Sequence, residues 1–372
     1  MKFRSLMLAM IWLTILSSHS AEGQGDSPWL GKRVVISKDE AYLHDGPHRS
    51  ADVGAIFRVF TVEKVSREGL LWLKAGDARG WIGESSVVSY DQAIDFFTDE
   101  IRKRPDKSTL YTKRAVMWSD LGEFDKAIAD FEESVRIDPS DPNAICGRGC
   151  AWLLKHNVDK AIADFNNAIM LAPDLGTAYC DRGAAWLTKR EYDKAISDCD
   201  EAIRLDPGDF MAFNNRGAAR FGKKDYSRGL ADCDEAIRLN PGNPLAFGVR
   251  ANIRVAKREY GKALADYDEA CRLAPATIAG FNARAWIYAT CPDRRYRDGE
   301  KAIRSATRAC ELSCWRDADD LDTLAAAYAE AGDFARAVEW EEKAIGLVEG
   351  DEREARFRKR RDLYRDGKPY RS

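Results

Sequence analysis

The chain has 372 residues, which is longer than a typical single compact domain. Its 45% hydrophobic and 32% charged residues are the proportions of an ordinary folded protein and exclude a disordered chain. The formal net charge of -3 creates no global field for nucleic acid, so we expect no nucleic-acid partner.

The first residues have the layout of a secretory signal. Lys2 and Arg4 precede an apolar run over residues 6–16, and small residues follow it. The apolar run is shorter than the roughly 20 residues that a membrane-spanning helix needs. We therefore predict a signal peptide over residues 1–21 and an exported protein, periplasmic or extracellular, with no membrane span in the mature chain. Retention through an uncleaved N-terminal membrane anchor is the alternative.

Residues 28–89 contain short runs that are typical of β-strands. The runs are "RVVIS", "AIFRVFTVEKV", "LLWLKA" and "RGWIG", separated by clusters of Gly, Asp and Ser. They predict a small N-terminal β-barrel.

From residue 90 onward the sequence is a tandem array. Prolines recur every 34 residues, at Pro105, Pro139, Pro173, Pro207, Pro241 and Pro275. A small residue lies 12 places before each proline and usually another lies 5 before, with a bulky residue or cysteine 8 before. This spacing places the three side chains on one face of a helix. A further small residue, 24 places before each proline, belongs to a first helix that precedes this second helix in the unit. The proline ends the second helix. Each unit is predicted to be a helical hairpin whose apolar face is buried by its neighbours.

These recurring Ala, aromatic, Ala and Pro positions resemble the tetratricopeptide repeat. The resemblance implies a mainly α fold, a right-handed α-solenoid over residues 90–350. It comprises a half repeat, five regular repeats, a sixth with five residues inserted around "CPDRRYRDG", and a final repeat. The charged segment 351–372 is predicted to be a capping helix. The N-terminal runs, which close with Gly80-Trp81, resemble the bacterial Src-homology-3-like domain.

Catalytic motifs were not found. The histidines after the signal are His44, His48 and His156, and the sequence has neither an HExxH metal motif nor a GxSxG nucleophile turn. We therefore expect no catalytic, cofactor-binding or metal-binding residues and no cofactor. The basic run "RFRKRR" over residues 356–361 is interpreted as part of a solvated helix, because acidic residues surround it.

Cysteines form one group of interest. Cys146 and Cys150 are four residues apart on a predicted helix, and Cys180 takes the place of Cys146 one repeat later. A metal or redox site is one interpretation, but neighbours four apart suit a disulfide poorly and no fourth ligand is evident. We interpret these cysteines as small core residues.

Arginines and aspartates recur in step with the prolines. Arginines 25 residues before each proline are Arg114, Arg148, Arg182, Arg216 and Arg250. Aspartates nine before each proline are Asp130, Asp164, Asp198, Asp232 and Asp266. An arginine that packs between repeats needs a partner, because an unpaired buried charge costs several kcal/mol. We predict a structural ladder of Arg–Asp pairs between repeats, with a ligand-binding arginine row as the alternative.

The family geometry implies that the first helix of each hairpin lines a concave, partner-binding face. The residues expected there are Asn143, Cys146, Cys150, Thr177, Cys180, Ala184, Met211, Asn214, Ala218, Leu245 and Asn252. This surface is mixed in character, and extended or helical peptide segments are plausible ligands for it.

The resulting hypothesis is a non-enzymatic, exported scaffold or adaptor for protein–protein interaction. A protein or peptide partner would lie on the concave face, and the barrel would bind a peptide or cell-envelope ligand. Two alternatives stay open: an accessory component of a cell-envelope enzyme, for example in peptidoglycan processing, and a purely structural spacer.

Overall fold

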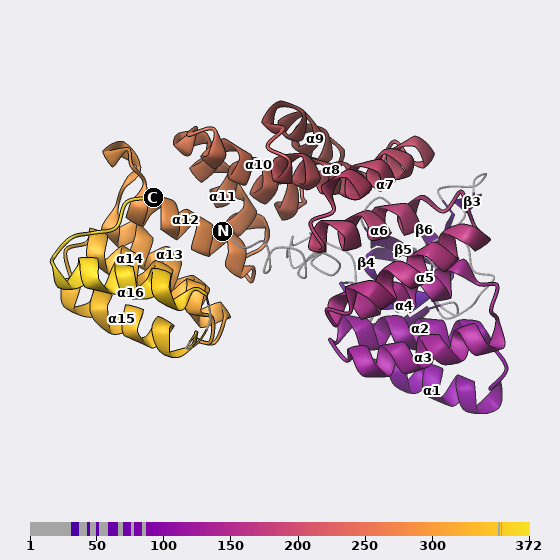
Figure 1. Cartoon of the computed structure of the whole chain (residues 1–372). Helices are drawn as coiled ribbons and strands as arrows, with labels where there is room; N and C mark the ends of the chain where they lie inside the picture. The colour runs from indigo at the N-terminus through magenta and orange to yellow at the C-terminus, as the bar shows by residue number, and fades with distance from the viewer. Residues whose placement is uncertain are drawn as a thin grey trace. The chain divides into compact units, whose positions relative to one another are not determined.

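The computed structural model describes residues 31–36, 43–44, 50–51, 59–65, 70–75, 78–83, 87–348, 350 and 352–372 (Figure 1). The predicted signal peptide over residues 1–21 lies outside this described part. Among the described residues, no helix is both long and apolar enough to cross a membrane.

The N-terminal strands form one antiparallel sheet. Its strands are β1 (Arg33–Ile36), β2 (Leu43–His44), β3 (Ser50–Ala51), β4 (Val59–Val65), β5 (Leu70–Ala75), β6 (Ala78–Gly83) and β7 (Val87–Ser89). They pair in the order β3-β2-β6-β5-β4-β1-β7. Val34, Val62 and Leu71 are buried. Because β3 and β7 stand at the two ends of this order, the described strands form an open sheet and do not support the predicted barrel.

The rest of the described chain is helical, which confirms the predicted mainly α class. The helices are α1 (Ala93–Lys103), α2 (Ser108–Asp120), α3 (Phe124–Ile137), α4 (Pro142–Leu154), α5 (Val158–Leu171), α6 (Gly176–Thr188), α7 (Tyr192–Leu205), α8 (Phe210–Gly222), α9 (Tyr226–Leu239), α10 (Pro244–Ala256), α11 (Tyr260–Leu273), α12 (Ile278–Thr290), α13 (Gly299–Leu312), α14 (Ala318–Glu330), α15 (Phe334–Gly346) and α16 (Glu354–Arg365). Successive helices pack as hairpins, for example α2 with α3, α4 with α5 and α14 with α15.

Close helix packing follows from the small residues of the repeat. At Gly149 on α4, an added Cβ atom would lie 2.7 Å from the ring of Phe165 on α5. Ala161 on α5 is completely buried. The second helix ends two residues before the proline, as α5 does at Leu171, because proline supplies no amide hydrogen.

The hairpin turns require a left-handed backbone. His156, Arg190, Lys224 and Arg258 hold φ between 60° and 63° at the same place in four repeats. The turn after α8 shows the reason, because the amide of Asp225 returns to the carbonyl of Arg220 at 2.8 Å. Glycine occupies this place only at Gly122 among the first five turns.

Replacing Lys224 by glycine is expected to stabilise the protein by up to about 1 kcal/mol. A side chain in the left-handed region costs about 1–2 kcal/mol, and part of the gain is offset by the greater backbone freedom of unfolded glycine. Urea unfolding of the Lys224→Gly variant measures this change. Lys223, with φ -81°, is the control, since glycine there should only destabilise. A Lys224→Gly variant no more stable than the parent would contradict the account.

The insertion in the sixth repeat is folded. It contains the 3-10 helix η4 (Arg294–Tyr296) between α12 and α13. The ring of Tyr296 lies 5.9 Å from that of Tyr260, and Arg297 forms an ion pair with Glu330 at 3.1 Å. The extra residues therefore join the preceding and following repeats to the sixth.

The chain divides into two compact units between Ala185 and Trp186, within α6. The upstream unit contains the sheet, α1–α5 and most of α6, and the downstream unit contains the remaining helices. The domain boundary expected at residues 89–90 stays a prediction.

Candidate partner-binding surface

The residues predicted for the concave face lie on the first helices of four hairpins, α4, α6, α8 and α10. Asn143 and Thr177 are exposed. Partly buried members are Cys150, Ala184, Met211, Leu245 and Asn252. Fully enclosed members are Cys146, Cys180, Asn214 and Ala218. The four buried side chains offer a partner no contact in this conformation and belong to the packing between helices.

The two asparagines near the middle of this set are structural. Tyr267 on α11 donates a hydrogen bond of 2.6 Å to Oδ1 of Asn252, which ties α10 to α11. Asn214 is completely buried, and its amide donates to Oδ1 of Asn215 at 3.5 Å. Asn214 is therefore closed to an incoming partner, and the Oδ1 atom of Asn252 is engaged within its own hairpin.

Four of the recurring arginines contact the aspartate of their own hairpin. Arg114 donates two hydrogen bonds of 2.7 Å to Asp130, and Arg148 contacts Asp164 at 2.7 Å. In the downstream unit, Arg216 contacts Asp232 at 2.8 Å and Arg250 contacts Asp266 at 2.7 Å. The two members of the remaining predicted pair belong to different compact units: Arg182 lies on α6 in the upstream unit, and Asp198 is buried on α7 in the downstream unit.

These pairs correct one part of the prediction. Each aspartate belongs to the same hairpin as its arginine, so the pair closes a hairpin and does not join neighbouring repeats. The link between repeats comes from another residue, 16 places before the arginine. Arg216, Arg250 and Arg284 contact Asp200, Asp234 and Asp268 of the preceding hairpin at 2.6, 2.7 and 2.7 Å. The 34-residue period of these acids was visible in the sequence and was missed.

Two of the buried aspartates hold a second arginine. Arg220 contacts Oδ2 of Asp232 at 2.7 Å, and Arg254 contacts Oδ2 of Asp266 at 2.6 Å. Each carboxylate therefore balances two guanidinium groups inside a hairpin, with both of its oxygens engaged.

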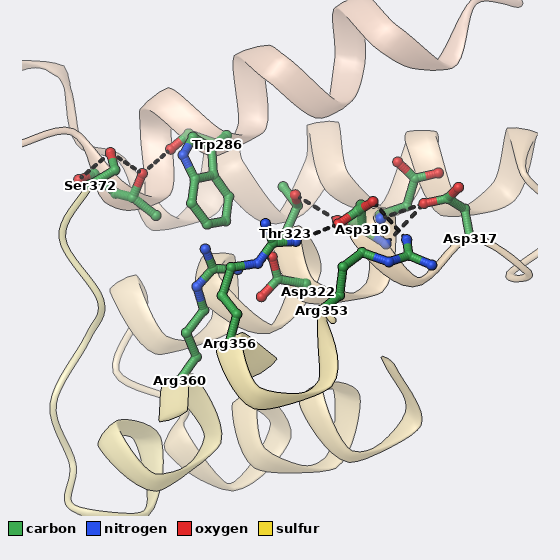
Figure 2. Close-up of polar contacts among 11 residues, drawn as sticks. Trp286, Asp317, Asp319, Asp322, Thr323, Arg353, Arg356, Arg360 and Ser372 are labelled. Carbon is green, nitrogen blue, oxygen red and sulfur yellow. Dashed lines mark hydrogen bonds and ion pairs between the residues drawn. The ribbon is translucent and has the colours of Figure 1, made fainter. Parts of the chain in front are cut away.

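At the end of the array, α16 covers α14 through charged side chains (Figure 2). Arg353 and Arg356 both contact Asp319 at 2.9 Å, and Arg360 contacts Asp322. Phe357 and Tyr364 on the same helix are completely buried. The basic run is therefore not wholly solvated as expected, because Arg360 is also buried.

Beneath Arg360 lie two buried carboxyl groups. Asp322 on α14 and Glu341 on α15 are both enclosed, and the guanidinium of Arg360 contacts Asp322. Burial, followed by the nearby Asp322 charge, raises the pKa of Glu341 to about 11. Since Asp322 is the carboxylate that Arg360 contacts, Glu341 is the member that holds a proton at neutral pH.

The last residues of the chain lie along α12 and α14. The amide of Ser372 donates to the carbonyl of Thr290 at 3.1 Å, and the two hydroxyls are 2.9 Å apart. Arg371 forms an ion pair with Glu330 at 2.6 Å. Figure 2 shows Arg360 beside Trp286, with its guanidinium carbon 4.7 Å from the centre of that ring.

Tyr370 completes this contact. Its ring centre is 5.9 Å from that of Trp286, and Arg360 lies 4.6 Å from it as well. We call residues Tyr370–Ser372 the tail segment and their contacts on α12 and α14 the tail site. No sequence signal indicated this site, because it joins residues that are about eighty positions apart.

A thiol cluster lies on α4 and α6. The thiols of Cys146 and Cys150 lie 3.5 and 3.3 Å from Oδ2 of Asp181. A hydrogen bond from Cys150 lowers the pKa of Cys146, but burial and the Asp181 charge outweigh it and the net shift is upward. The hydrogen bond with Cys146, together with burial, raises the pKa of Cys150 well above its usual value. All nine cysteines belong to the described residues, and they are not joined in disulfides.

Two family models match the sequence. Both are described as tetratricopeptide repeat, and they match residues 109–141 and 153–210. Over these two segments the chain is similar to tetratricopeptide repeats. This result confirms the repeat resemblance, whereas the Src-homology-3-like resemblance and a bacterial origin stay predictions.

Solved structures of tetratricopeptide proteins share the fold. The Cut9–Hcn1 hetero-tetramer of APC/C gives a TM-score of 0.61 at 16% identity, over 73% of this chain and 52% of that chain. Yeast Tom70 gives 0.52 at 20% identity, over 74% of this chain and 59% of that one. Because this chain spans only about half to three-fifths of these proteins at low identity, the likeness shows the fold alone. No curated protein matches the sequence.

Proposed function

We propose that this protein is a non-enzymatic scaffold that binds an extended protein segment on the first helices of its tetratricopeptide array. Repeats of this family serve as protein–protein interaction scaffolds, which supports the general class. The finer proposal concerns where the partner lies and what kind of segment it is.

The tail site is the observation that carries the proposal. It holds a short segment by a main-chain hydrogen bond at Thr290, an ion pair at Glu330 and a ring contact at Trp286. These are the three kinds of contact by which grooves recognise extended peptides: backbone bonding, a charge and an aromatic anchor. A partner with an aromatic residue followed by arginine would reproduce all of them.

The tail segment then acts as an internal competitor. A tethered ligand has an effective concentration on the order of mM, so a free peptide binds weakly while the tail is in place. Partner binding would displace the tail segment and fill the tail site in its place.

Export and a cell-envelope setting belong to the same proposal. The charge and apolar pattern of residues 1–21 supports export. The N-terminal sheet is then the proposed contact for a peptide or envelope ligand.

Weakening the tail is expected to open the site. A labelled peptide with the sequence of residues Lys368–Ser372 should bind the Tyr370→Ala/Arg371→Ala variant at least about tenfold more tightly than the parent. Fluorescence anisotropy measures both affinities. Lys368→Ala is the control, because the Lys368 side chain is exposed and lies 3.6 Å from nearby Asp366, outside the tail segment.

Two further results decide the matter. Adding Trp286→Ala to the double variant should abolish peptide binding, because it removes the aromatic anchor. Equal affinity of the peptide for the parent, the double variant and the triple variant would refute binding at the tail site.

A further inference from the structure

The thiol cluster brings together three metal-ligating side chains from two helices. Cys146 and Cys150 are one helical turn apart on α4, so both sulfurs lie on the same side of that helix. Asp181 comes from α6, the first helix of the next hairpin. The two sulfurs and one carboxylate oxygen all lie within 4.8 Å of one another.

The spacing of these atoms matches a zinc coordination sphere. Zinc bonds of about 2.3 Å to sulfur and about 2.0–2.2 Å to carboxylate oxygen put the two atoms about 3.5 Å apart at a tetrahedral angle. The observed distances from Asp181 to the two thiols are 3.5 and 3.3 Å. The cation would fit with little movement of the helices.

We propose that Cys146, Cys150 and Asp181 bind one Zn²⁺ ion, with water as the fourth ligand. Both thiols lose their protons to solvent on binding, because thiolate is the form that ligates zinc. Cys150 and Asp181 are only partly buried, which leaves access for the ion and for the water.

This inference replaces the interpretation of the cysteines as small core residues. The sequence showed no further ligand, because Asp181 lies 31 positions beyond Cys150 and is a neighbour only in the folded chain. A disulfide does not explain the pair, since side chains one turn apart on a helix suit that geometry poorly. The bound ion would join α4 to α6 and so hold two consecutive repeats together, whatever partner the tail site binds.

Metal binding can be tested on the untagged, reduced, full-length protein. Co²⁺ titration should give a thiolate-to-cobalt charge-transfer band that saturates at one equivalent, and Zn²⁺ should then abolish the band. Cys146→Ser should weaken binding by at least about 100-fold, because losing a direct ligand costs more than losing an outer-shell partner. Asp181→Asn, which preserves side-chain shape, should also weaken binding. Cys271→Ala is the control, because that thiol is buried on α11, outside the cluster.

A second measurement does not depend on the band. Zn²⁺ should raise the thermal unfolding temperature of the parent and of Cys271→Ala, but not that of Cys146→Ser or Asp181→Asn. Circular dichroism establishes that each variant is folded. A cobalt band absent from the parent, or equally strong in Cys146→Ser, would overturn the proposal.

Discussion

Replacing Asp266 by asparagine is expected to lower the free energy of unfolding by about 3 kcal/mol. Asp266 is 3% exposed and accepts hydrogen bonds from both Arg250 and Arg254. Asparagine keeps the shape of the side chain but removes its charge. The largely buried guanidinium of Arg254 would then lose its charged partner Asp266, and that of Arg250 would keep its contact with the exposed Asp234 but lose the buried one. This cost far exceeds that of losing one surface ion pair.

Asp268 on the same helix is the matched control. It also contacts an arginine, Arg284, at 2.7 Å, but its side chain is 55% exposed. Asp268→Asn should therefore cost less than about 1 kcal/mol. Urea unfolding, followed by circular dichroism, compares both variants with the parent. If both variants lost the same free energy of unfolding, the burial of Asp266 would add nothing to the cost of removing its charge.

The other large effect is pH-dependent and concerns Glu341. Its pKa is raised to about 11 in the folded protein, from an ordinary value of 4.5. Above pH 4.5 the unfolded chain loses this proton while the folded chain keeps it. The contribution of Glu341 to stability is therefore fully present below pH 4.5 and is lost progressively as the pH rises toward 11.

Glu341→Gln is expected to remove this dependence, because glutamine is a neutral copy of the protonated side chain. Each pH unit in that window costs the parent up to about 1.4 kcal/mol, so the variant should be more stable by about 2–5 kcal/mol at pH 8. At pH 4 the two proteins should be nearly equal. Denaturant unfolding between pH 4 and pH 9 gives the slope directly.

The neighbouring residue Glu342 provides the control. Its side chain is 51% exposed and contacts Arg365 at 2.6 Å, so Glu342→Gln should change the free energy of unfolding by less than about 1 kcal/mol. A Glu341→Gln variant with the parent slope would mean that Glu341 is ionised in the folded protein.

Much of the fold could be predicted from local patterns in the sequence. The prolines every 34 residues located the ends of the second helices, because a proline cannot donate the next helical hydrogen bond. The small residues located the close helix contacts, as at Gly149, because only they let two backbones approach. The insertion in the sixth repeat was also visible as a break in the period.

The candidate sites were less predictable, since residue types can be read from the sequence but their contact partners cannot. The sequence indicated that Arg250 needs an acid and that Asp266 recurs with it. It did not distinguish a pair inside one hairpin from a pair between two, because both satisfy the same period. The mixture of exposed and buried residues on the predicted concave face was likewise hidden, since one helical face borders both the partner and the next repeat.

The sequence by itself therefore determined the repeated helical hairpins of this protein, because each depends on residues within one 34-residue period. Tertiary structure alone decided which polar groups meet. The tail segment reaches Trp286, Arg360 neutralises Asp322 beneath α16, and Asp181 lies beside two thiols of the preceding repeat. The physical reason is that such contacts depend on the packing of separate helices, and no local period in the chain records the distance between them.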